Sequence, residues 1–132
     1  MHLFSRRRWT RVGLMIFLMV LFPALTAWPQ GATPNTGRPA ILDFGRGVCP
    51  TCKKMEAILT KLKGQYGDQV EVRLVYLDKE ESLFTQYRIM MVPTQVFLDG
   101  SGKEVDRHIG LFPEEELVKK LQELQFLKEK GK

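Results

Sequence analysis

The stretch "ILDFGRGVCPTCKKM", from Ile41 to Met55, contains both cysteines of the 132-residue chain, Cys49 and Cys52. Its first part is a short apolar run that predicts a buried strand, although Asp43 interrupts it. Beyond the cysteines the apolar residues recur at helical spacing, which predicts an amphipathic helix. The two cysteines therefore lie at the junction between a strand and a helix.

Two cysteines three positions apart can form a structural crosslink, part of a metal site or a reactive dithiol. A crosslink would close a very short loop, and the stabilisation that a disulfide provides decreases with loop length. A structural zinc site usually has four protein ligands, and only His2 and His108 are available to supplement the pair. A module that binds a soft metal such as copper or zinc remains the alternative to a dithiol.

The local sequence predicts different roles for the two cysteines. Pro50 suits the first position of the helix, because its missing N–H would have no partner there. Cys49 is then the N-cap, and we expect its sulfur to face the amides of Thr51 and Cys52. These amides and the helix dipole stabilise a thiolate. We therefore expect Cys49 to be the nucleophile and Cys52 the resolving thiol that releases the product from a mixed disulfide.

Charge and composition indicate that the protein does not bind nucleic acid. The chain has a net charge of +5 and 44 % apolar residues, which fits one globular domain. Arg6, Arg7, Arg8 and Arg11 lie in the first thirty residues, which contain no acidic residue. The remaining sixteen Lys and Arg, of 20 in total, face 15 Asp and Glu. Because this part is nearly neutral and has no basic block, we expect no nucleic-acid binding.

The first thirty residues resemble a targeting segment. An uncharged apolar run, residues 12–28, follows the arginines, as in a signal peptide or an N-terminal membrane anchor. Its length fits neither alternative closely, and the poor cleavage site "ALTAW" favours an uncut anchor slightly. The positive-inside bias places the rest of the chain outside the cytoplasm in both cases. We expect a bacterial exported protein, in the periplasm or at the outer face of the cytoplasmic membrane.

The rest of the chain predicts a single domain. Residues 31–37 are rich in Pro, Gly, Thr and Asn and predict a linker. A folded domain is expected over residues 38–128, with a tail at 129–132. Asp78 and Glu81 form a possible capping box for the second of its three helices. The expected elements follow in the order 40–44, 50 to about 64 or 67, 70–77, 78–87, 95–98, 103–110 and 113–130. This βαβαββα order predicts an α/β three-layer domain, a central mixed sheet flanked by helices.

Three segments in this order resemble a thioredoxin-fold oxidoreductase over about residues 38–127. They are the opening stretch, "VPT" at residues 92–94 and the hairpin "FLDGSGKEVDRHIG" at residues 97–110. The N-terminal strand and helix of full thioredoxin have no clear counterpart in this sequence. The resemblance implies a thioredoxin-like fold and a redox-active disulfide, with no further cofactor and a monomeric protein.

The resemblance also implies roles for individual residues. Asp43 matches a buried Asp that accepts the proton of Cys52, and burial raises the pKa of such a carboxyl. Pro93 matches a cis-proline beside the dithiol, where the backbone pairs with an extended substrate. Gly110 matches a glycine that lines the same groove. The implied substrate-binding residues are Val92, Pro93, Gly110, Pro50 and Thr51.

The sequence departs from thioredoxin around the cysteines. Thioredoxin has Gly-Pro between them and a Trp before them, whereas this chain has Pro50, Thr51 and Val48. A proline usual in the helix is absent, with Ala57 near its place. Because the intervening pair influences the redox potential in this family, a disulfide-forming oxidant remains an alternative to a reductase.

The expected activity is reduction of disulfides in partner proteins, for example in cytochrome c maturation or disulfide repair. Electrons would come from a membrane thiol conduit. Met90 and Met91, just before "VPT", either form an apolar rim for partner docking or fill the core. His108 is expected to be an exposed strand residue.

Overall fold

The computed structural model describes residues 37–128 of the chain. The predicted targeting segment, nearly all of the predicted linker and the predicted tail lie outside these residues, so they remain predictions. Within residues 37–128, no helix is both long enough and apolar enough to cross a membrane.

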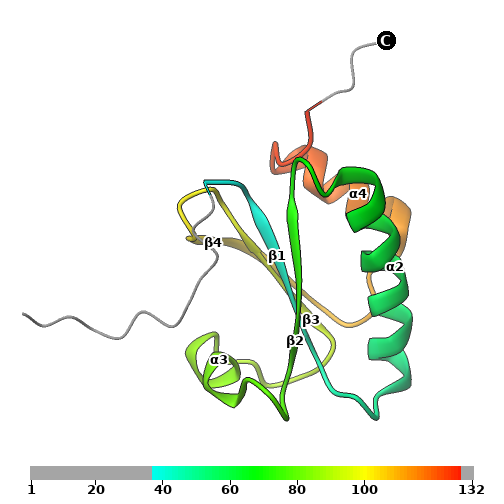
Figure 1. Cartoon of the computed structure of the whole chain (residues 1–132), viewed down its shortest axis with the longest axis vertical. Coiled ribbons are helices and arrows are strands. Elements are labelled where there is room, and N and C mark those ends of the chain that lie inside the picture. Colours follow the sequence, from blue (N-terminus) through cyan, green and yellow to red (C-terminus); the bar gives the residue numbers. More distant parts are fainter. Residues whose placement is uncertain (1–36, 129–132) are drawn as a thin grey trace, which may run out of the picture. The chain divides into compact units, whose positions relative to one another are not determined.

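The described part of the chain forms four strands and three helices in the predicted order (Figure 1). The elements are β1 (Ala40–Gly45), α2 (Pro50–Tyr66), β2 (Glu71–Tyr76), α3 (Glu81–Gln86), β3 (Thr94–Leu98), β4 (Glu104–Ile109) and α4 (Glu114–Glu123). The strands form one sheet in the order β2-β1-β3-β4. β1 is parallel to β2 and antiparallel to β3, and β3 is antiparallel to β4. The α/β mixed-sheet prediction is therefore confirmed.

Helices cover both faces of this sheet. α2 and α4 lie on one face and α3 on the other (Figure 1). Each face has its own apolar cluster, and side chains of β1 contribute to both because they alternate between the faces. The cluster under α2 and α4 includes Ile41, Phe97, Met55, Leu59, Leu117 and Leu121. The cluster under α3 includes Leu42, Phe44, Val96, Leu83 and Phe84. All six residues of β1 are buried, which explains why its sequence is almost wholly apolar.

The start of α3 corrects one prediction. α3 begins at Glu81 after the N-cap Glu80, which makes no side-chain capping hydrogen bond, so the expected capping box from Asp78 is absent. The amides of Lys79 and Glu80 both donate to the Tyr76 carbonyl oxygen, at 3.0 and 2.9 Å. This turn holds Asp78 outside the helix, where its side chain cannot act as a cap.

The end of α4 corrects a second prediction. The helix ends at Glu123 and does not continue toward Lys128. Gln125 has a φ of 60°, in the left-handed region that stops a helix. Beyond this reversal Phe126 and Leu127 are buried in the cluster under α2 and α4. Burial of these two side chains, rather than local helix propensity, decides where α4 stops.

Candidate active site

Cys49 and Cys52 form a disulfide at the N-terminus of α2, with their Cα atoms 5.2 Å apart. Cys49 is the N-cap and Pro50 occupies the first helical position, as predicted. The Cys49 sulfur accepts a hydrogen bond from the Cys52 amide at 3.2 Å, so one of the two expected amide donors is observed. After reduction this amide faces the Cys49 sulfur, where it stabilises a thiolate.

The two sulfur-bearing residues differ in exposure. Cys49 is half-buried, whereas Cys52 is only 4 % exposed. A partner disulfide can therefore approach Cys49 more easily than Cys52. This asymmetry supports the prediction that Cys49 attacks and Cys52 resolves.

Asp43 is a buried carboxyl group in the middle of the sheet. It is 3 % exposed, so it is not a solvated side chain at the end of the strand. Gln95, its partner on β3, donates a hydrogen bond from Nε2 to Asp43 Oδ1 at 2.8 Å. The pKa of Asp43 is raised to about 6: burial is the largest cause, the Gln95 hydrogen bond lowers the pKa, and the negative charge of Glu56 adds to the rise. Asp43 is therefore a base that can hold a proton near neutral pH.

The strand geometry places Asp43 close to Cys52. Asp43 and Gly45 point to the same face of β1, because side chains two residues apart share a face. A Cβ atom added to Gly45 would lie 3.5 Å from the Cβ of Cys52. Residues two apart in a strand are separated by about 6.6–6.8 Å, so Asp43 lies one strand repeat from the residue that packs against Cys52. This geometry supports the pairing of Asp43 with Cys52 that the resemblance implied, and the pairing remains a prediction.

The predicted substrate-binding residues gather at the same end of the sheet. The Val92–Pro93 peptide bond is cis, as the resemblance implied. The Gly110 amide donates to the Pro93 carbonyl oxygen at 2.8 Å. Thr94, the residue after Pro93, pairs with Phe44 of β1, one residue before Gly45. The cis-proline segment therefore lies beside the junction that carries the cysteines, where Pro50 and Thr51 are exposed.

Gly110 has a φ of 102°, which L side chains rarely adopt, although a Cβ atom at this position would contact nothing within 4 Å. We expect Gly110→Ala to lower the free energy of unfolding by about 1–3 kcal/mol through backbone strain alone. Urea unfolding of the variant measures this effect. Gly47→Ala is the control. A Cβ atom at Gly47 would also meet open space, but the φ angle of Gly47 is not in the positive region that L side chains rarely adopt. Equal stability of the two variants would contradict the strain argument.

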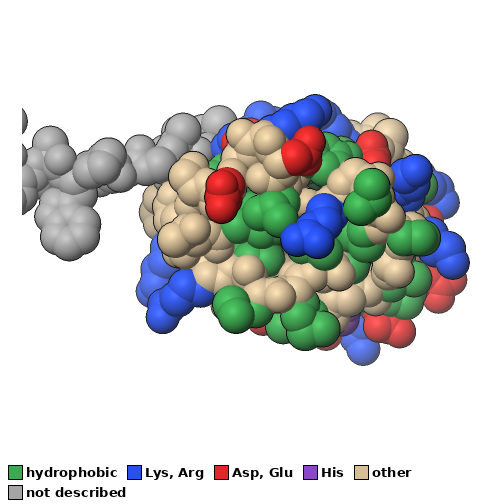
Figure 2. Space-filling model, turned by 90° about the horizontal axis from the view of Figure 1, so that it is seen from below, with side chains coloured by type: hydrophobic (Ala, Val, Ile, Leu, Met, Phe, Trp, Pro, Cys, Tyr) green, Lys and Arg blue, Asp and Glu red, His purple; other side chains and the backbone are tan. Residues whose placement is uncertain are grey.

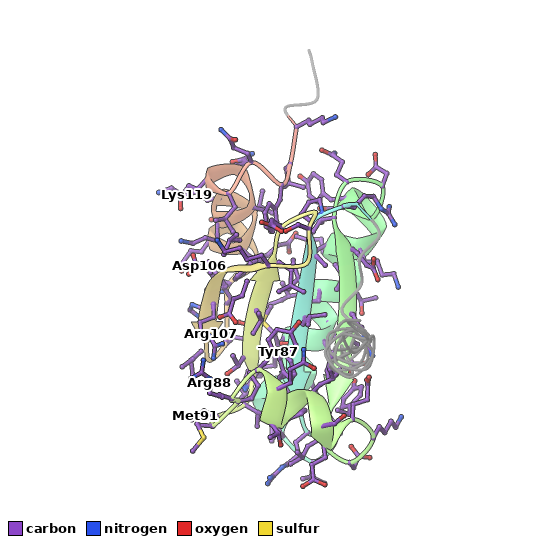
Figure 3. The ribbon with its side chains drawn as sticks, turned by 90° about the vertical axis from the view of Figure 1, so that its left-hand side faces the viewer. Tyr87, Arg88, Met91, Asp106, Arg107 and Lys119 are labelled. Carbon is purple, nitrogen blue, oxygen red and sulfur yellow. A yellow bond between two sulfur atoms is a disulfide. The ribbon has the colours of Figure 1, made fainter. Side chains whose placement is uncertain are left out.

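Exposed apolar side chains surround the disulfide. Met90 and Met91 are 91 % and 63 % exposed, so the interpretation that they fill the core is wrong. Met91 projects away from the domain (Figure 3). The exposed large apolar residues next to the dithiol or the cis-proline segment are Val48, Met90, Met91, Ile109 and Leu111. Figure 2 looks at the end of the domain where α2 begins, and hydrophobic side chains form patches across it.

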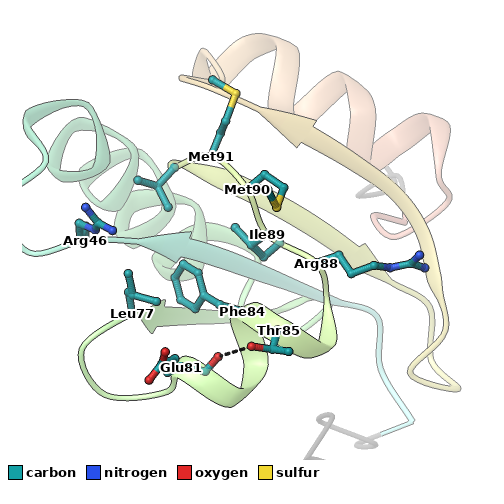
Figure 4. Close-up of a pocket in the computed structure, with 10 residues that line it drawn as sticks. Arg46, Leu77, Glu81, Phe84, Thr85, Arg88, Ile89, Met90 and Met91 are labelled. Carbon is teal, nitrogen blue, oxygen red and sulfur yellow. Dashed lines mark hydrogen bonds between the residues drawn. The ribbon is translucent and has the colours of Figure 1, made fainter.

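A groove with a cavity volume of about 730 Å³ continues from this apolar surface toward α3 (Figure 4). Leu77, Phe84 and Ile89 provide apolar walls, and Arg46 and Arg88 stand on opposite sides. This groove could not be identified from the sequence. Its walls come from three separate segments, which no local pattern relates to one another.

Gln95 and the packing of His108 were not predicted from the sequence. Gln95 is wholly buried in an apolar strand, the same signal that drew attention to Asp43. Its Oε1 atom has no hydrogen-bond partner among the described residues. His108, the cross-strand neighbour of Gln95, is half-buried and stacks on Phe112 with ring centroids 3.9 Å apart. The expectation of an exposed His108 is therefore wrong. Within residues 37–128 there is no group of three or more metal-ligating side chains.

Residues 31–125 match the family of thioredoxin-like domains. The chain belongs to this family. It is similar to thioredoxin 2 of Chlorobaculum tepidum, with 29 % identity over 71 % of this chain and 85 % of the relative. A TxlA-homologous thiol:disulfide interchange protein of Synechocystis sp. shares 30 % identity over 68 % of this chain and 51 % of the relative. The thioredoxin structure of Fasciola hepatica superposes with a TM-score of 0.61 and 30 % identity, over 67 % of this chain and 83 % of that one.

The family and the geometry agree on the chemistry. A member of this family with a disulfide at a helix N-terminus is a thioredoxin-like disulfide oxidoreductase. Cys49 and Cys52 form the disulfide of this domain, and their exchange of electrons with a partner remains a prediction that the geometry supports. The roles of Asp43, Val92, Pro93 and Gly110 remain predictions that this geometry supports.

Proposed function

We propose that the protein reduces disulfides of partner proteins outside the cytoplasm. The observation that carries this proposal is the exposed apolar surface around the Cys49–Cys52 disulfide. Apolar side chains exposed beside a reactive group are typical of a protein-docking surface. Methionine adapts its shape to different partners, and Met90 and Met91 provide two such side chains.

The reaction begins with the reduced pair. The Cys49 thiolate attacks one sulfur of the partner disulfide, forms a mixed disulfide and releases the first partner thiolate. Asp43 then takes the proton of Cys52, and the Cys52 thiolate attacks the Cys49 sulfur. This second exchange re-forms the Cys49–Cys52 disulfide and releases the second partner thiolate. Each partner thiolate takes a proton from solvent, so the partner gains two electrons and the cysteine pair is oxidised.

A dithiol donor must reduce the pair before the next cycle. We assign this role to a membrane thiol conduit, because the N-terminal sequence resembles an export signal or anchor. The similarity of this chain to a thiol:disulfide interchange protein of Synechocystis sp. supports an exchange of electrons between thiols and disulfides. Apocytochrome c cysteines or misoxidised proteins outside the cytoplasm are the partners that fit such a reductase.

A redox equilibrium titration of the full chain tests the direction of electron flow. We expect a potential near or below about −270 mV, which identifies an electron donor to partner disulfides. A potential approaching roughly −120 mV would instead identify an oxidant that introduces disulfides and would overturn the proposed direction. Reduction of a protein disulfide by the pre-reduced chain, followed over one turnover, provides the second readout.

A further inference from the structure

A second cavity, of about 300 Å³, is lined by Cys52, and neither Met90 nor Met91 lines it. Besides Cys52, the side chains in its wall that titrate or carry charge are Arg46, Lys53, Glu56, Tyr76, Asp78 and Lys79. Most of these residues are exposed, so the cavity is open to the surface. A polar cavity of this size accommodates several water molecules. The cavity therefore connects the wall beside the resolving cysteine to the surface.

Glu56 is the one acidic residue of α2, and it lies four positions after Cys52. Residues four apart on a helix lie on the same face, so Glu56 and Cys52 both turn toward the sheet. Glu56 is accordingly half-buried, whereas Lys53 and Lys54 are exposed. The sequence places a carboxylate one helical turn beyond the resolving sulfur.

Tyr76 completes this wall from β2. Tyr76 pairs with Gly45 of β1, and a Cβ atom added to Gly45 would lie 3.5 Å from the Cβ of Cys52. Burial raises the pKa of Tyr76, and the hydrogen bond between its hydroxyl and Glu56 raises it further. The negative charge of Glu56 acts on Asp43 as well, where it favours the protonated carboxyl. Glu56 thus couples electrostatically to the buried base while facing a cavity that solvent enters.

We propose that Glu56 is a positioning residue for the resolving step: it acts through Asp43 and, with Tyr76, lines the path by which the proton taken from Cys52 returns to solvent. This inference rests on the proposed function, which assigns proton acceptance to Asp43. The S–H bond of Cys52 breaks, an O–H bond forms on Asp43, and the Cys52 sulfur displaces the partner thiolate from Cys49. Asp43 afterwards loses its proton to solvent in the cavity.

The charge of Glu56 matters because proton transfer from a thiol needs a base of sufficient strength. A negative charge beside Asp43 makes it a stronger base, so Cys52 loses its proton more readily. Asp78 lines the same cavity from the loop after β2, but it is exposed, whereas Glu56 is half-buried on the face of α2 that carries Cys52. These two acidic residues therefore form a matched pair for an experiment.

The experiment compares Glu56→Gln with Asp78→Asn in the full chain. NMR titration of the Asp43 carboxyl in the oxidised protein gives its protonation midpoint, and a single-turnover assay gives the pH profile of the resolving step. We expect Glu56→Gln to move both midpoints to lower pH by about 0.5 and to slow resolution at neutral pH about two- to fivefold. Asp78→Asn should leave both unchanged, and Glu56→Asp should restore most of the wild-type profile.

Two outcomes separate this inference from the proposed function. An active chain whose Asp43 midpoint and pH profile do not respond to Glu56→Gln would overturn the role of Glu56 alone. A wild-type chain that reduces no protein disulfide would overturn the proposed function, whatever the NMR titration shows. Because Glu56 is half-buried at the surface of α2, we expect Glu56→Gln to fold, and its unfolding curve verifies this.

Discussion

Replacing Cys49 with serine should reduce the rate of protein-disulfide reduction by about 10³-fold or more, to the uncatalysed level. The hydroxyl of serine is not ionised near neutral pH and cannot attack a disulfide sulfur in place of a thiolate. The rate of reduction of a protein disulfide by the pre-reduced chain measures this loss. A variant that keeps substantial activity would show that Cys52 can attack directly, despite its burial.

The corresponding change at the resolving position should have a different result. Cys52→Ser retains the Cys49 nucleophile but cannot displace the partner, so we expect a mixed disulfide to accumulate. Non-reducing electrophoresis and mass spectrometry of the adduct identify the linked cysteine. The matched control is the double variant with both cysteines replaced, which should form no adduct. Rapid release of the partner by Cys52→Ser would contradict the assignment of the two roles.

Asp43→Asn should change both stability and catalysis, with opposite signs. The pKa of Asp43 is about 6 in the folded protein, whereas an unperturbed aspartate has a pKa of 3.8. The folded state therefore disfavours the carboxylate. The stability associated with the protonated carboxyl is therefore fully present below about pH 3.8 and is lost as the pH rises through about 6. Above this range the wild-type carboxylate lowers the free energy of unfolding by about 3 kcal/mol. The asparagine of the Asp43→Asn variant does not ionise, so the free energy of unfolding of the variant lacks this pH dependence.

Unfolding by urea at several pH values measures the stability effect. We expect the variant to gain about 3 kcal/mol relative to the wild type between about pH 3.5 and pH 8. The difference in unfolding free energy between variant and wild type is compared between pH values. Any effect of the buried asparagine that does not depend on pH therefore cancels. Asp68→Asn, at an exposed site, is the control and should show no such gain. Parallel pH dependence of Asp43→Asn and the wild type would contradict the raised pKa.

The catalytic effect of Asp43→Asn should appear in the resolving step. We expect this step to slow by about 10²-fold above pH 6, where the wild-type carboxylate is available as a base. The difference should shrink below pH 6, because the wild-type Asp43 is then protonated too. Release of the partner from the pre-formed mixed disulfide gives the rate. An unchanged rate would assign deprotonation of Cys52 to solvent instead.

Several features of the site were predictable because they depend on neighbouring residues. Pro50 at the first helical position and Cys49 as the N-cap follow from local backbone preferences, and both are confirmed. The alternation of apolar residues predicted the elements and their order. Ends of elements were less predictable, since α4 stops where Phe126 and Leu127 enter the core. Likewise, a backbone turn at Tyr76 removed the expected cap of α3.

The sequence by itself determined the fold family, the order of the elements and the position of the dithiol at the start of a helix. The order of the elements and the position of the dithiol arise from periodicity and capping within a few residues of one another, whereas the fold family was implied by the resemblance of three separate segments to a thioredoxin-fold oxidoreductase. Only the tertiary structure decided the pKa of Asp43, because its partner Gln95 lies 52 residues away and its burial depends on α2 and the sheet together. The coupling of Glu56 to Asp43 has the same origin. Electrostatic energies depend on distance and burial in space, and neither is fixed by separation along the chain.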